Sequence, residues 1–306
     1  MSTEQRVMAD GLGPERTVAV PGAVLAVRGP AAADDGLPPA LFVHGLGGSG
    51  ENWTELVAEL SGDLSAETVD LPGCGWSAPP EDGNFSLSGH VRAVIGYLEA
   101  AGRGPVHLFG NSLGGAVAVR LAALRPDLVR SLTLISPALP ELPPQRTAWP
   151  TGLLAVPGVP SLLRRTRPGG DVEQAIRDLL ALVYGDPAAV RPAQWERAVA
   201  EYRRRSGLPY SLAALAGSAR GIVSAYTERG EQSLWRQAGQ VKAPVLLVYG
   251  LRDKLVSYRS ARRACAAFAD ARLLVLPEAG HVAMLEHPEL VARSVRELLA
   301  ESLRSV

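Results

Sequence analysis

The chain has 306 residues, of which 47% are hydrophobic and 20% are charged. This composition excludes an intrinsically disordered protein, because the chain carries enough apolar surface to bury a large core. Its 31 basic residues balance its 31 acidic residues, which excludes the broad positive footprint of a nucleic-acid-binding protein. At a usual domain size of roughly 150 residues, the length fits two units, or one α/β unit that carries an insertion.

Cys74 and Cys265 are the two cysteines of the chain, and they form no C-x-x-C motif. Two such residues indicate neither a metal site nor a disulfide framework, so we expect a reducing, cytoplasmic location. The N-terminal stretch lacks an apolar signal segment, and the most lipophilic stretch, residues 151–163, is short and broken by prolines. We therefore expect no membrane anchor. The sequence leaves the oligomeric state open.

Short apolar runs bounded by Gly, Pro or Asp alternate with amphipathic segments of helical period. This alternation predicts a mostly parallel sheet covered by helices. After a hairpin over residues 17–29, the strands are expected to end at Gly45, to surround Val69, to end at Gly110, to surround Leu134, and to end at Gly250 and Pro277. The helices are expected over residues 53–60, 87–100, 113–124, 258–268 and 288–303.

This rhythm breaks between residues 139 and 240, which open with a proline-rich stretch and then show helical periodicity alone. We predict an all-helical cap, residues 139–240, inserted after the sixth strand of a core formed by residues 1–138 and 241–306. The expected apolar faces of its helices are Val172, Ile176, Leu179 and Val183, then Trp195, Val199 and Tyr202, then Leu212, Leu215, Ile222 and Tyr226. Leu153, Leu154, Leu162, Leu163 and Trp149 could line a lipophilic pocket or simply pack in a core.

The segment GNSLGG, residues 110–115, lies between an apolar run and a helical stretch. It indicates a strand, a sharp turn and a helix, with Ser112 on the turn. Such a turn strains the backbone of its serine and requires tiny neighbours two positions away, here Gly110 and Gly114. The pentapeptide alone is weak evidence, but in this context it predicts that Ser112 is a nucleophile.

A serine hydroxyl needs an imidazole to accept its proton and an acid to orient that imidazole. Asp253 follows one late strand and His281 follows the next. The carboxyl ends of parallel strands meet at one edge of a sheet, so the order Ser112, Asp253, His281 predicts a catalytic triad there. The sequence after the strand around Leu134 offers no carboxylate before Glu141.

The other histidines receive different interpretations. His287 precedes Pro288, which is typical of the first position of a helix, so His287 is the weaker candidate for the catalytic base. His90 and His107 fall in a helix and a strand, where packing or surface roles are expected.

An oxyanion formed on the substrate requires donors that already point at it. The backbone N–H of Leu113, at the start of a helix, is one candidate. The loop HGLGG, residues 44–48, follows an early strand, and its Leu46 N–H is the second. We expect His44 to fix this loop, Asp70 to stabilise the next glycine-rich turn, and Cys74 in that turn to be a packing or rim thiol.

The motifs HGLGGSGENW, DLPGCGWS, GNSLGG, PVLLVYGLRD and AGHVAMLEHPE together resemble the α/β-hydrolase superfamily along nearly the whole chain. The resemblance implies an α/β-hydrolase fold with an eight-stranded, mostly parallel sheet and a helical cap. It also implies a triad of Ser112, Asp253 and His281, with the Leu46 and Leu113 amides as oxyanion hole. Serine at the nucleophile position favours acyl transfer to water over the branches that carry aspartate there.

GNSLGG is similar to the GNSMGG of hydrolases that cleave carbon–carbon bonds of meta-cleavage products, and Asn111 matches their asparagine. Those relatives usually carry tryptophan after the catalytic histidine, where this chain has Val282. We therefore favour a cofactor-independent esterase acting on a small, lipophilic ester with water, and expect no metal. The alternatives are a carbon–carbon hydrolase, a receptor that retains the triad, and, more weakly, a lyase.

Charge is distributed unevenly along the chain. Residues 139–238 contain 13 arginines and nine acidic residues, a net charge of +4, so the remainder carries −4. One hypothesis is that the cap favours anionic substrates; the alternative is that these arginines lie on solvated helix faces.

Overall fold

The computed structural model describes residues 12–13, 15–30, 36–141, 143–156 and 171–302. Its eight strands form one sheet in the order β1-β2-β4-β3-β5-β6-β7-β8. Strands β4, β3, β5, β6, β7 and β8 run parallel, and β1 and β2 form an antiparallel hairpin at one edge. This confirms the predicted mostly parallel sheet. The strands are β1 Glu15–Val20, β2 Ala23–Arg28, β3 Pro39–Val43, β4 Ser65–Val69, β5 Val106–Asn111, β6 Val129–Ile135, β7 Val245–Gly250 and β8 Ala271–Leu276.

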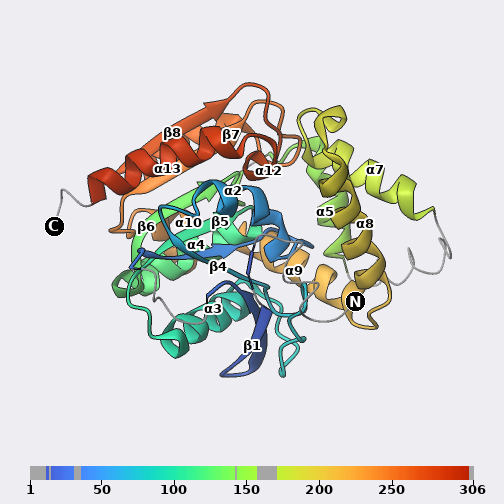
Figure 1. Cartoon of the computed structure of the whole chain (residues 1–306), viewed down its shortest axis with the longest axis horizontal. Helices are drawn as coiled ribbons and strands as arrows, with labels where there is room; N and C mark the ends of the chain where they lie inside the picture. Colours follow the sequence, from blue (N-terminus) through green and yellow to red (C-terminus); the bar gives the residue numbers. More distant parts are fainter. Residues whose placement is uncertain (1–11, 14, 31–35, 142, 157–170, 303–306) are drawn as a thin grey trace.

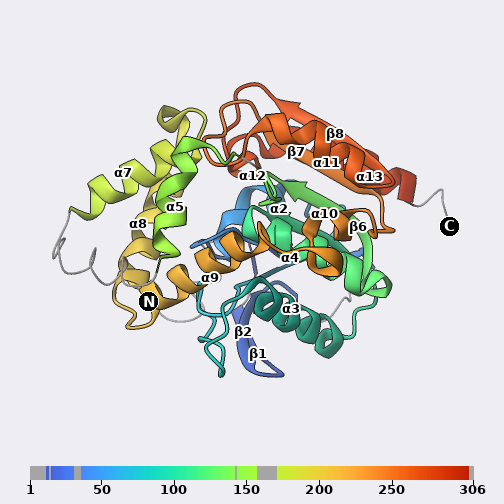
Figure 2. The ribbon, with the colours of Figure 1, turned by 180° about the vertical axis from the view of Figure 1, so that it is seen from behind.

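Helices cover both faces of this sheet (Figures 1 and 2). One face carries α3 (Leu87–Ala101), α4 (Leu113–Leu124), α10 (Leu234–Ala238) and α11 (Ala261–Ala267). The other carries α2 (Thr54–Glu59), α12 (Ala283–Glu286) and α13 (Pro288–Ser302). The second layer encloses a buried aromatic cluster in which the rings of Phe42 and Phe109 stack with centroids 4.1 Å apart and Trp53 packs at an angle to both. Both faces of the central strands are thus withdrawn from water, as their continuous apolar runs require.

The described residues between β6 and β7 form helices and turns, with no strand among them. Apart from α10, these helices gather at one end of the sheet (Figures 1 and 2). They are α5 (Trp149–Leu154), α7 (Val172–Val183), α8 (Pro192–Ser206) and α9 (Ser211–Ala225). α10 instead packs against α4 and α11. None of the described helices has both the length and the apolar character needed to cross a bilayer.

Two expected helix faces were partly wrong. On α7, Leu179 is 42% exposed, and Leu180 is buried beside Ile176 instead. On α9 the buried face consists mainly of small residues, including Gly217 and Gly221, rather than the expected leucines. A Cβ atom on Gly217 would lie 2.7 Å from the Phe85 side chain. Because α9 packs closely against the Phe85 segment, its small residues are buried there in place of the larger apolar residues that were expected. Leu162 and Leu163 lie outside the described residues.

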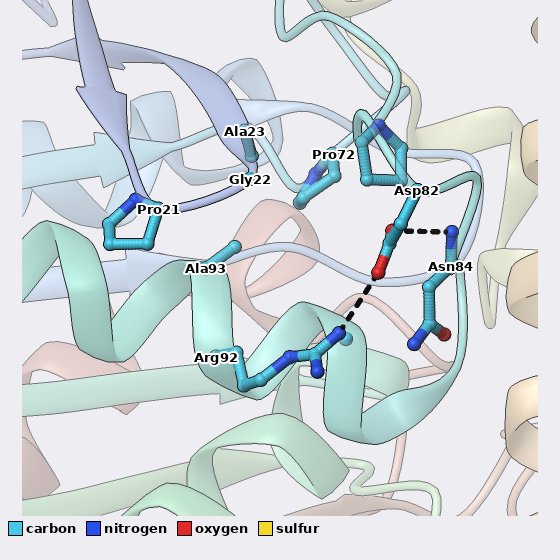
Figure 3. Close-up of a pocket in the computed structure, with 10 residues that line it drawn as sticks. Pro21, Gly22, Ala23, Pro72, Asp82, Asn84, Arg92 and Ala93 are labelled. Atoms are coloured by element: carbon cyan, nitrogen blue, oxygen red, sulfur yellow. Dashed lines mark hydrogen bonds and ion pairs between the residues drawn. The ribbon is translucent and has the colours of Figure 1, made fainter.

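The β1–β2 turn borders a surface pocket of about 280 Å³ (Figure 3). Asp82 lies at its rim, where it accepts a hydrogen bond from the backbone N–H of Asn84 and pairs with Arg92 at 3.3 Å. A second pocket of about 600 Å³ lies between α7 and α8, beside Trp195. Neither pocket is lined by a residue predicted to act in catalysis.

Two buried histidines bond to hydroxyl groups on neighbouring elements. His90 of α3 lies 2.9 Å from the Ser218 hydroxyl of α9, and His107 of β5 lies 2.7 Å from the Ser131 hydroxyl of β6. Burial lowers the pKa of His90 to about 3 and that of His107 to about 4. Both histidines therefore serve packing, as expected, and stay neutral at physiological pH.

These histidines predict acid-sensitive stability. An unfolded chain binds their protons near pH 6.5, whereas the folded chain resists protonation until the pH is far lower. The free energy of unfolding should therefore fall below about pH 6.5, by up to about 1.4 kcal/mol per pH unit for each histidine. Urea titrations near pH 7.5 and pH 5 measure this loss. The loss should be smaller in His90→Gln; an equal loss in that variant would contradict the assignment to His90.

Candidate active site

Ser112 lies on the turn between β5 and α4, with φ at 52° and ψ at −115°. This left-handed backbone is unfavourable for a residue with a side chain. A Cβ atom on Gly110 would lie 2.5 Å from the Gly114 carbonyl oxygen, and one on Gly114 would lie 2.2 Å from the carbonyl oxygen of Val43. The glycines therefore let β5, α4 and the end of β3 approach so closely that the turn cannot relax.

Asp253 and His281 follow β7 and β8, and the structure brings them together. The His281 Nδ1 lies 2.9 Å from Asp253 Oδ2, and both side chains are buried. The other carboxylate oxygen accepts hydrogen bonds from the backbone N–H groups of Leu255 and Val256, at 2.7 and 3.0 Å. Burial alone would raise the pKa of Asp253, but the adjacent imidazole and the Val256 N–H outweigh it and lower the pKa. An ionised carboxylate thus accepts from Nδ1 and leaves Nε2 available to take a proton.

Asn111 connects the serine turn to the histidine loop. Its Nδ2 donates to the backbone oxygens of Ile135 and His281, at 3.0 and 3.1 Å. The residue before Ser112 therefore holds the residue that carries the imidazole. Among the described side chains, the Ser112 hydroxyl makes no direct hydrogen bond to that imidazole.

The loop after β3 lies directly beside Ser112. A Cβ atom on Gly45 would lie 3.2 Å from the Ser112 Cβ and 2.8 Å from the Asn111 side-chain oxygen. The N–H of Leu71 donates to His44 Nε2 at 3.0 Å, so the His44 proton is on Nδ1 and donates to the Gly45 carbonyl at 2.7 Å. His44 thus ties together the loops after β3 and β4. Leu46 directly follows Gly45 in this loop, and Leu113 begins α4 directly after Ser112.

A family model of the α/β-hydrolase fold matches residues 38–288, which include all of these loops. The chain belongs to the α/β-hydrolase fold family. It is 30% identical over 271 residues to the dihydrolipoyllysine-residue acetyltransferase component of the acetoin cleaving system of Pseudomonas putida, covering 87% of this chain and 64% of that relative. This chain therefore spans less than two thirds of that relative.

Two further matches cover nearly the whole of the proteins compared. The pimeloyl-[acyl-carrier protein] methyl ester esterase of Chromobacterium violaceum is 29% identical over 266 residues, which cover 86% of this chain and 94% of that enzyme. The structure of a meta-cleavage product hydrolase from Pseudomonas fluorescens matches with a TM-score of 0.74 and 21% identity, covering 94% of this chain and 98% of that one. The structural match supports the fold alone.

Hydrogen bonds hold the glycine-rich loop after β4 in place near the candidate site of this α/β-hydrolase. Asp70 accepts hydrogen bonds from the backbone N–H groups of Gly50, at 2.6 Å, and Trp76, at 2.7 Å, so it stabilises the loop as expected. Cys74 is buried, and burial raises the pKa of its thiol to about 12. Its thiolate is therefore scarce at neutral pH, which fits the expected packing role.

Three residues near Asp253 and His281 were not assigned a role in the site from the sequence. Ser136, at the end of β6, is buried with φ at 45°, and its side chain helps to lower the pKa of Asp253. Glu141 accepts from the Ser257 backbone N–H at 3.1 Å, and burial raises its pKa. Glu286 bonds to the residue before His281. Ser136 alone had a sequence signal, since it directly follows a predicted strand.

Neither a metal site nor a cofactor site was expected. Within the part of the chain that the structure describes, no three His, Cys, Asp or Glu side chains are placed to hold a metal ion together.

The close packing of backbone around the Ser112 turn predicts that Gly114→Ala destabilises the α/β-hydrolase core. The added methyl group would collide with the backbone of β3 rather than with a movable side chain. We expect a loss of about 1–3 kcal/mol in the free energy of unfolding, as for other overpacked cores. Urea denaturation measures it. Gly62→Ala is the control, because nothing lies within 4 Å of a Cβ there; equal stability of the two variants would refute the constraint.

Proposed function

We propose that the protein is a serine hydrolase that cleaves a carboxylic ester of a small, lipophilic substrate through an acyl-enzyme. The observation that carries this proposal is the buried 2.9 Å contact between His281 Nδ1 and Asp253, in a loop that Asn111 bonds to the strained serine turn. The carboxylate fixes one tautomer of the imidazole, so that Nε2 can serve as a base. The membership of the chain in a hydrolase family supports the same chemistry.

In the first half of the proposed reaction, Ser112 Oγ attacks the ester carbonyl while His281 Nε2 takes the hydroxyl proton. The Leu46 and Leu113 N–H groups donate to the oxygen that becomes negatively charged. Asp253 stays ionised and stabilises the imidazolium. The tetrahedral intermediate then collapses, the bond to the alcohol oxygen breaks, and the imidazolium donates its proton to the departing alcohol.

In the second half, water attacks the acyl-enzyme and gives its proton to His281. The new tetrahedral intermediate releases Ser112, which regains its proton from the imidazolium, and the carboxylic acid leaves. This cycle uses water as the second substrate and needs no cofactor. The proposal includes the cytoplasmic location expected from the two cysteines, both of which are free.

Within residues 139–240, helices α5, α7, α8 and α9 form the proposed cap over a core of residues 1–138 and 241–306. Three contacts support a cap that reaches the catalytic loops. Arg205 of α8 donates to the Gly47 carbonyl, in the loop after β3. Gln145 donates to the Asp253 carbonyl at 3.1 Å. Lys254, beside Asp253, reaches back with its ammonium group to the Ala181 carbonyl of α7 at 2.5 Å.

A carbon–carbon hydrolase is the second candidate. The observation that favours it is Asn111, which matches the asparagine of that branch and bonds to the histidine loop. Val282 follows His281, where that branch usually has tryptophan, and this favours the esterase. Comparing p-nitrophenyl esters with a 2-hydroxy-6-oxo-dienoate substrate separates the two.

Loss of the Ser112 hydroxyl should abolish turnover. Ser112→Ala should lower kcat on short p-nitrophenyl esters by roughly 10³-fold or more, because the three triad residues act as a unit. A fluorophosphonate probe should label Ser112, as peptide mapping would show. The matched variant Cys74→Ala should keep both labelling and turnover. Near-normal hydrolysis by Ser112→Ala would refute the proposal, and a single burst without turnover in the unmodified protein would favour a receptor.

The charge imbalance predicts a preference for anionic esters. The predicted cap, residues 139–240, has a net charge of +4 and should attract a substrate carboxylate more strongly at low ionic strength. We expect kcat/KM for a monoester of a dicarboxylic acid to exceed that for a neutral ester of equal length, and the ratio to shrink as salt is added. A ratio independent of both charge and salt would assign these arginines to solvated helix faces.

A further inference from the structure

The end of α7 touches the histidine loop backbone to backbone. The His281 N–H donates to the Val183 carbonyl at 2.7 Å. A Cβ atom on Gly280 would lie 2.4 Å from the Gly185 nitrogen, and one on Gly185 would lie 2.2 Å from the Glu278 carbonyl oxygen. The two segments are about a hundred residues apart in the chain, yet no side chain fits between them here.

Glu286, the last residue of α12, bridges this contact with both of its carboxylate oxygens. Oε2 accepts from the Gly185 N–H at 2.7 Å, and Oε1 accepts from the Gly280 N–H at 2.8 Å. Neither donor pairs elsewhere in a helix or strand, so each relies on this carboxylate. An amide could satisfy one of the two donors, but its NH₂ group would face the other.

The peptide groups around His281 are therefore held on three sides. Glu286 binds the N–H of Gly280, Val183 binds the N–H of His281, and the Asn111 amide binds the His281 carbonyl. Because these bonds hold the backbone, only rotation of the His281 side chain can change the 2.9 Å contact between the imidazole and Asp253. Asn111 comes from the serine turn and Val183 comes from α7, so the loop is clamped between the nucleophile and the helical insertion.

We propose that Glu286 is a positioning residue, which holds the His281 loop against the end of α7 so that the imidazole stays aligned between Asp253 and Ser112. This inference rests on the proposed function, because alignment matters only if His281 transfers protons. Both carboxylate oxygens of Glu286 bind backbone N–H groups rather than a reacting side chain. Its loss should therefore lower the rate of chemistry at each folded site, while substrate binding stays nearly unchanged.

The experiment compares Glu286→Gln and Glu286→Asp with Glu289→Gln. Glu286→Gln removes one acceptor and the charge, whereas Glu286→Asp keeps the charge but shortens the reach. Glu289 is an exposed carboxylate three residues on, so its variant controls for the loss of charge. With sites counted by fluorophosphonate titration, we expect kcat on a short p-nitrophenyl ester to fall roughly tenfold in both Glu286 variants, with KM within about twofold. Glu289→Gln should match the parent protein.

Gly185→Ala tests the same contact from the α7 side without touching the carboxylate. Its methyl group should push the His281 loop away and give the same loss of kcat at constant KM. If the Glu286 variants do not fold, Gly185→Ala alone tests the positioning role. The rate of fluorophosphonate labelling at Ser112 serves as a second readout that needs no knowledge of the natural substrate. It should slow in parallel with kcat.

The outcomes separate the two proposals. If Ser112→Ala is inactive but kcat per site and the labelling rate are normal in Glu286→Gln, Glu286→Asp and Gly185→Ala, the positioning role is overturned and the triad stands. A lower unfolding midpoint with a normal kcat per site would likewise reduce Glu286 to a purely structural residue. If Ser112→Ala keeps its activity, the proposed function itself fails.

Discussion

The backbone of Ser112 is the constraint on which the rest of the site depends. Its φ of 52° would relax if the chain around it had room. The room is absent because β5, α4 and the end of β3 meet at glycines, with no clearance for even a methyl group. The packing of the eight-stranded sheet thus compensates for the unfavourable backbone conformation of Ser112. A hydroxyl on such a turn projects beyond the sheet edge, toward the loops that follow the neighbouring strands.

The insertion between β6 and β7 contacts each of those loops through polar groups. Arg205 reaches the loop that contains Leu46, Gln145 reaches the loop of Asp253, and Val183 accepts from the N–H of His281. A movement of the insertion would therefore displace Asp253, His281 and the proposed oxyanion donors together. In the proposed mechanism, this helical layer therefore affects the chemistry although it lies far along the chain from Ser112. It supports the loops, while the sheet supports only their ends.

Sequence reasoning succeeded where local pattern and chemistry coincide. The alternation of apolar runs predicted the sheet, and the loops after β7 and β8 carry the predicted acid and base, Asp253 and His281, which lie 2.9 Å apart. Their catalytic roles stay a prediction. Sequence reasoning failed for contacts between segments that lie far apart in the chain. The bond between Asn111 and the carbonyl of His281 joins residues 170 positions apart, and Glu286 bonds to Gly185 across 101 positions. Helical periodicity likewise could not tell Leu179 from Leu180, because the partner surface decides which one is buried.

The surroundings of the buried histidines support the proposal that His281 transfers the proton. Of the four buried histidines, His90 and His107 bond to hydroxyl groups and His44 to backbone groups. Burial lowers the pKa of each of these three, so an imidazolium is unfavourable there. His281 is also buried, but the carboxylate of Asp253 contacts its Nδ1. A buried imidazole that must gain and release a proton in each cycle needs an opposite charge beside it, because neutral dipoles alone leave the cation too costly. The loop after β7 is where this fold supplies that charge.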